Sequence, residues 1–123
     1  MRKSVWREIP YPEIDYGEDQ AWAYKIIEKG YGKVYAPNAV VYHSHDYTPV
    51  EAMERAKIES WFFSTVFNEN LAKYDVVSEI DARNAEAERI GHLANLSREE
   101  IDKKRALNVA EVIGAVGGLY GVR

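Results

Sequence analysis

The chain of 123 residues contains no cysteine. This absence excludes disulfide bonds and thiolate metal sites, and it removes one indication of secretion. No stretch approaches the roughly 18 consecutive apolar residues of a membrane-spanning helix. Residues 1–15 carry basic side chains but no apolar run, so they do not resemble a signal peptide. We therefore expect a cytoplasmic protein, with peripheral contact at the inner face of the membrane left open.

The sequence also lacks a concentration of positive charge. Its 16 lysines and arginines are spread along the chain and are outnumbered by 20 acidic residues, which gives a net charge of −4. A nucleic-acid-binding domain needs a concentrated basic surface, so we expect no nucleic-acid partner. The hydrophobic fraction of 46% and the length are those of one globular domain with a usable core.

The first part of the chain mixes several kinds of local pattern. Residues 1–16 are predicted to be a loop because Pro10 and Pro12 are closely spaced. Apolar side chains at three- and four-residue spacing predict a helix over 18–29, which Gly30 ends. Valine and tyrosine predict two short strands, 33–36 and 39–43, separated by a turn at residues 37–38.

The second part is helical in pattern. Thr48, Pro49 and Glu51 form a capping-box start for a helix that runs to about Phe67. Further capping boxes begin at Ser78 and Ser97 and predict helices to about residues 94 and 116, with residues 117–118 ending the last one. The segment 68–74 is either a break or a continuation. We therefore expect two regions, residues 1–49 and a helical extension at 50–123.

Two adjacent carboxylates, Glu18 and Asp19, lie where a loop enters the first predicted helix. A carboxylate acts as a general base when it reaches the proton that is removed. The ordinary alternative is that acidic residues stabilise a first helical turn by interacting with the helix dipole. On composition alone this ordinary explanation is the stronger one.

A second polar cluster, His43-Ser44-His45-Asp46, follows the second predicted strand. In a strand, His43 and His45 project to the same face, and imidazole is a good ligand for a divalent metal. The alternative is a hydrogen-bonded histidine at the end of a strand.

The ordered run YGEDQAWAYKIIEKGYGKVYAPNAVVYHSH, residues 16–45, resembles the closing segment of the GT-A fold in family-two glycosyltransferases, close to bacterial rhamnosyltransferases. In that family an acid pair precedes a helix that ends at a glycine, and a valine-rich strand leads into a histidine. The matching residues are Glu18, Asp19, Trp22, Gly30, Tyr31, Val34, Tyr35, Pro37, Val40, Val41, His43 and His45. The resemblance covers Met1 to about Pro49 and implies an α/β, helix-rich fragment of a GT-A domain.

The resemblance also implies roles for individual residues. Asp19 is the expected catalytic base toward an acceptor hydroxyl, and Glu18 orients the acceptor or holds the loop. His43, or else His45, is expected to bind the Mg²⁺ or Mn²⁺ ion that neutralises the leaving diphosphate. Trp22 is the candidate for stacking on a sugar, although its helical spacing favours core packing. The implied partners are a nucleotide-sugar donor and a glycan acceptor of cell-surface polysaccharide synthesis.

The family's nucleotide-binding half, with its metal-binding Asp-x-Asp motif, has no counterpart in this sequence. We therefore expect a fragment that is inactive alone and that self-associates into a homo-oligomer. Membrane contact through the last helix is less favoured than packing, because that helix has few basic residues. The rival hypotheses are a non-catalytic helical interaction module, and a small metal-binding protein or hydrolase that uses Glu18, Asp19, His43, His45 and Asp46.

Overall fold

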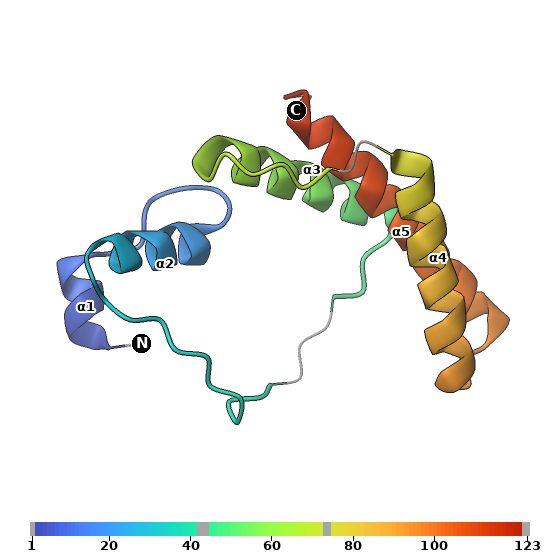
Figure 1. The fold of residues 1–123 in the computed structure, drawn as a ribbon, viewed down its shortest axis with the longest axis horizontal. Coiled ribbons are helices and arrows are strands. Elements are labelled where there is room, and N and C mark those ends of the chain that lie inside the picture. Colours follow the sequence, from blue (N-terminus) through green and yellow to red (C-terminus); the bar gives the residue numbers. More distant parts are fainter. Residues whose placement is uncertain (1, 42–44, 73–74, 122–123) are drawn as a thin grey trace. The chain divides into compact units, whose positions relative to one another are not determined.

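The computed structural model describes residues 2–41, 45–72 and 75–121. Five helices are present in these ranges: α1 (Lys3–Glu8), α2 (Glu18–Glu28), α3 (Pro49–Val66), α4 (Val76–Leu93) and α5 (Arg98–Leu119) (Figure 1). The chain separates into two compact units, Met1–His45 and Asp46–Arg123, which are described in turn. Over the described ranges none of the helices is both long enough and apolar enough to cross a membrane.

The regular structure of the described residues is all helical, so the predicted α/β fold with a strand pair is wrong. The predicted turn does form, since the amide of Ala39 donates to the carbonyl oxygen of Ala36 at 3.0 Å. On either side of it Val34, Tyr35, Val40 and Val41 are 80–87% exposed. An isolated two-stranded pair is marginal in water without a further strand or helix to cover it, and none of the described residues covers these side chains.

The first unit is built around one face of α2. Trp22 and Ile26 form its core together with Val5 of α1, a helix that was predicted to be loop. Ile9 and Tyr31 pack against this cluster. The phenol of Tyr31 donates to the Glu8 carboxylate at 2.6 Å, which joins the segment that follows α2 to the last residue of α1.

The capping box that the sequence predicts at the start of α3 is confirmed. The Thr48 hydroxyl accepts from the Glu51 amide, the Glu51 carboxylate accepts from the Thr48 amide, and Pro49 occupies the first turn. At the other end of the helix Phe62 is 1% exposed and packs edge-to-face on Phe63 and Phe67. Phe62 therefore belongs to the core of the second unit.

Glycines of α5 let it approach α3 closely. A Cβ atom added to Gly114 would overlap the carbonyl oxygen of Met53, and one added to Gly118 would overlap the carbonyl oxygen of Lys57. The Cβ atom of Ser60, a fully buried residue of α3, would lie 2.8 Å from a Cβ atom added to Gly118. The predicted end near residue 116 is therefore wrong: α5 continues through these glycines to Leu119, because they serve as contact surface for α3.

Helix α4 begins before the predicted capping box at Ser78. Its N-cap is Asp75, whose carboxylate accepts from the Ser78 amide at 3.0 Å, so Ser78 is the third residue of the helix. The predicted cap at Ser97 of α5 is confirmed. Between the two helices the Asn108 side chain, which is 3% exposed, donates to Asn84 at 3.2 Å.

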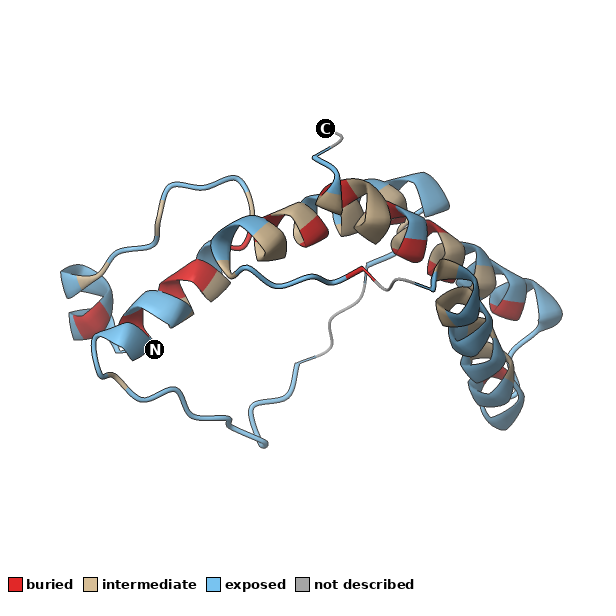
Figure 2. Cartoon of the chain, turned by 45° about the horizontal axis from the view of Figure 1, so that its top comes forward, coloured by how far each residue is buried: buried red, intermediate tan, exposed pale blue. Residues whose placement is uncertain are grey.

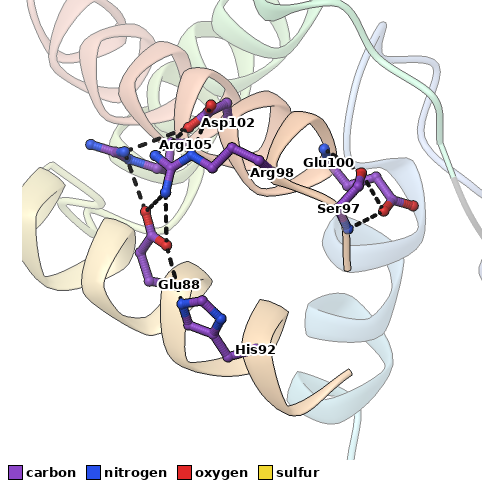
Figure 3. A network of polar contacts seen from close by, with 7 residues as sticks. All are labelled: Glu88, His92, Ser97, Arg98, Glu100, Asp102 and Arg105. Atoms are coloured by element: carbon purple, nitrogen blue, oxygen red, sulfur yellow. Dashed lines mark hydrogen bonds and ion pairs between the residues drawn. The ribbon is translucent and has the colours of Figure 1, made fainter. Parts of the chain in front are cut away.

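A polar network holds the ends of α4 and α5 together (Figure 3). Arg98 and Arg105 of α5 donate to the Glu88 carboxylate of α4, with nitrogen–oxygen distances of 3.1 and 3.3 Å. His92 lies 3.8 Å from the same carboxylate. Exposed ion pairs contribute little one at a time, but several charges in a network around one shared carboxylate contribute more to holding two helices together.

Candidate functional site

The acid pair lies where the chain turns into α2. Gly17 is the N-cap residue and has a left-handed backbone with φ 71°, a conformation that glycine adopts without steric cost. The Ala21 amide donates to the Gly17 carbonyl oxygen at 2.9 Å and closes the first turn. The turn therefore positions Glu18 and Asp19 as the first two helical residues, as the sequence predicts.

Both carboxylates are exposed at the positive end of the helix dipole. Asp19 Oδ1 accepts from the Gln20 amide at 2.8 Å, which orients the side chain beside one amide of the first turn. A carboxylate with an exposed face and a fixed position can accept a proton from a hydroxyl that approaches from solvent. The same geometry serves helix stabilisation, so it is compatible with both explanations from the sequence.

One turn further along α2, Trp22 is in the core and is only 8% exposed. Its indole N–H donates to the carbonyl oxygen of Ile9, the residue after α1. The structure thus gives Trp22 the packing position that its spacing favoured, and its role in binding a sugar remains a prediction. What Trp22 does for the acid pair is to hold the first turns of α2 against the preceding loop.

Beside Trp22 lies an aromatic residue, Tyr11, that is not among the site residues predicted from the sequence. The ring of Tyr11 lies 5.3 Å from the Trp22 ring, centroid to centroid, and Tyr11 is 39% exposed. An exposed aromatic ring backed by a buried one offers a face on which a sugar ring can stack. The signal was present in the run Pro10-Tyr11-Pro12, where the flanking prolines restrict the loop that presents the ring.

Only part of the histidine cluster lies among the described residues. His43 falls outside the described residues, whereas His45 is described and is exposed. Asp46 forms an ion pair with Lys103 of α5, and the hydrogen bond from that lysine holds the pKa of the Asp46 carboxyl below its ordinary value. Within the described ranges no three histidine, aspartate or glutamate side chains come together as a metal site. The described residues therefore do not by themselves fit a bound Mg²⁺ or Mn²⁺ ion.

Comparison with known proteins gives a partial relationship. A 56-residue stretch, 44% of the chain, is 45% identical to the O-antigen chain rhamnosyltransferase RfbN of Salmonella typhimurium, of which it covers 18%. No family model matches the chain, and no solved structure matches it. The chain thus spans less than a fifth of the relative that it matches, and part of it has a glycosyltransferase-like relationship.

Proposed function

We propose that residues 1–49 form the acceptor-side segment of an inverting sugar-transferring enzyme related to rhamnosyltransferases, and that residues 50–123 are a helical extension of it. The observation that carries this proposal is the 45% identity to RfbN over 56 residues. The exposed acid pair at the start of α2 supplies a chemical group suited to such a reaction.

In the proposed reaction, the Asp19 carboxylate takes the proton of an acceptor hydroxyl while that oxygen attacks the anomeric carbon of a nucleotide-sugar. The bond from the anomeric carbon to the nucleoside diphosphate breaks on the opposite face, so the configuration inverts. Glu18 orients the acceptor, and Tyr11 stacks on its ring. No step of this account passes through a metal, and the Mg²⁺ or Mn²⁺ ion expected for the whole enzyme remains a prediction.

The chain alone is not expected to transfer sugar, since its sequence has no counterpart of the metal-binding Asp-x-Asp motif that the resemblance implies for a nucleotide-binding half. A chimera tests whether the first unit is functionally equivalent to its relative. Residues 2–45 of this chain are placed in RfbN in exchange for the residues that a pairwise alignment of the two sequences matches to them, and transfer of labelled rhamnose to the acceptor is measured.

We expect the chimera to retain transfer, while a matched control with a flexible linker of the same length loses it. A chimera that folds and binds its nucleotide-sugar but transfers no sugar would contradict the proposal. The alternative of a non-catalytic interaction module would then be favoured.

A further inference from the structure

We propose that α4 is a self-association surface, which pairs antiparallel with α4 of a second copy of this chain about a twofold axis. This inference concerns the second unit and does not depend on the proposed sugar transfer. It starts from the outward face of α4, most of which is exposed (Figure 2).

The inner face of α4 is already occupied by α5. Gly91 is buried against Ile101, and Asn84 accepts from Asn108. The opposite face carries a stripe at the four-, three- and four-residue spacing of a helix-pairing seam. Its members are all exposed, and they are Ala82, Glu86, Arg89 and Leu93, with Ala85 and Ile90 beside them. Leu93 is 72% exposed and Ile90 is 48% exposed, so the outward face of α4 presents two large apolar side chains close together.

The order of these residues is self-complementary when the stripe meets a reversed copy of itself. With a twofold axis midway between positions 87 and 88, Leu93 faces Ala82 of the second copy, while Ile90 and Ala85 lie on opposite flanks of the seam. The large apolar side chain of the stripe, Leu93, thus meets the small Ala82, which is the large-to-small matching that lets helices pack closely. A twofold interface uses the same surface on both copies, so each match occurs twice.

The charged residues of the stripe, Glu86 and Arg89, are also complementary under the twofold axis. In the single chain, Arg89 donates two hydrogen bonds of 2.7 Å to Glu86 within the same helix. The same twofold axis brings Arg89 of one copy opposite Glu86 of the other, so four charges alternate in sign across the seam. A parallel arrangement would instead set Arg89 beside Arg89 and Leu93 beside Leu93. Charge and size therefore both favour the antiparallel pair.

The surface that a pair of α4 helices can bury is small, which limits the affinity expected of the dimer. An 18-residue helix is about 27 Å long, and one helix pair buries less than the roughly 1,600 Å² of a standard stable interface. We expect a weak dimer, populated at about 100 µM protein and dissociated well below that concentration.

The absence of cysteine makes a direct test possible with the full chain. Ala82→Cys and Leu93→Cys are prepared separately and oxidised alone or mixed. In the antiparallel pair, position 82 of one copy faces position 93 of the other. The two copies of position 82 are about 16 Å apart along the helix axis, and so are the two copies of position 93, which is too far for a disulfide. We expect the mixture to form covalent dimers several-fold above either variant alone, and above a Thr65→Cys control at an exposed position of α3.

Two further variants separate the interface from folding. Leu93→Gln, at an exposed position, should keep the helical circular dichroism and raise the dimer dissociation constant about tenfold or more in sedimentation equilibrium. Glu86→Arg should also weaken the dimer, and the double variant Glu86→Arg/Arg89→Glu should restore it. A monomer at about 100 µM, cross-linking of each cysteine variant alone, or a mixture that does not exceed the control would overturn the proposal.

Discussion

The indole N–H of Trp22 donates to the carbonyl oxygen of Ile9 and joins the first half of α2 to the end of α1. This bond lies one turn from the acid pair, so the position of Asp19 depends on the core of the first unit. Trp22→Ala removes both the bond and most of the buried surface, and should lower the local stability of α2 by about 3–5 kcal/mol. Trp22→Phe keeps most of the packing and should cost about 1–2 kcal/mol.

Amide hydrogen exchange of α2 measures this effect locally, since about 1.4 kcal/mol corresponds to a tenfold change in protection. Ile27→Ala is the matched control, because Ile27 lies in the same helix but is 51% exposed. Protection of α2 in Trp22→Ala that equals that of the control would show that this core does not hold the helix.

Adjacent glycines of α5 should respond in opposite directions to the same substitution. A Cβ atom at Gly118 meets backbone atoms of α3 that cannot move aside, so Gly118→Ala should destabilise the second unit by about 1–3 kcal/mol. A Cβ atom at Gly117 meets only the Lys57 side chain at 3.8 Å, so Gly117→Ala should stabilise α5 by about 0.5–1 kcal/mol through helix propensity.

Urea unfolding followed by circular dichroism tests this pair. Equal effects of the two alanines would contradict the close approach of α3 and α5.

A third variant addresses Ser60, whose buried hydroxyl makes no hydrogen bond to the described residues. Ser60→Ala should be neutral or stabilising, because it removes a buried polar group that has no partner there.

The helix caps predict a dependence of stability on pH. Hydrogen bonds from Ser97 hold the pKa of Glu100 below its ordinary value, and those from Thr48 do the same for the pKa of Glu51. Because both folded-state pKa values are lowered, the stabilisation is present above the ordinary glutamate pKa and is lost as pH falls through the folded-state value.

Carboxyl NMR titration of Ser97→Ala measures the effect at one cap and uses the other as an internal control. The substitution should raise the pKa of Glu100 toward its ordinary value and leave the pKa of Glu51 lowered. An unchanged pKa of Glu100 would mean that the cap at α5 does not form in solution.

Tyr11 is predicted to contribute to acceptor binding in the chimera with RfbN. Tyr11→Ala removes the exposed ring and should raise the KM for the acceptor several-fold with a smaller change in kcat, since stacking of the acceptor sugar on an aromatic face acts on binding. Tyr11→Phe keeps the ring and should behave almost as the parent. An acceptor KM that is the same in all three proteins would remove Tyr11 from the site.

The sequence predicted the ends of helices best where a capping residue marks them. Thr48 and Ser97 mark the starts of α3 and α5, and Gly30, with φ 84°, follows the end of α2. Two errors have a common cause, which is that packing overrides local preference. Glycines that usually end helices instead fit against α3, and α1 forms because Val5 packs on Trp22.

The strand pair was predicted from valine and tyrosine, which favour strands only where a neighbouring strand or a core covers them. No such cover exists for Val34 and Val41 among the described residues. The acid pair, by contrast, was located correctly at the entrance of α2, because Gly17 and the first-turn acids are local signals. The exposed ring of Tyr11 was not identified, because its contact with Trp22 joins residues from a loop and a helix.

The role of Asp19 can be measured most directly in the chimera that carries residues 2–45. The comparison is Asp19→Asn against Glu28→Gln, a carboxylate removed from the other end of the same helix, with sugar transfer and nucleotide-sugar binding determined for each. If Asp19 is the base, its substitution lowers kcat by about 100-fold or more, with donor affinity unchanged and with Glu28→Gln near the parent. Turnover that survives Asp19→Asn at the level of the Glu28→Gln control would contradict the account.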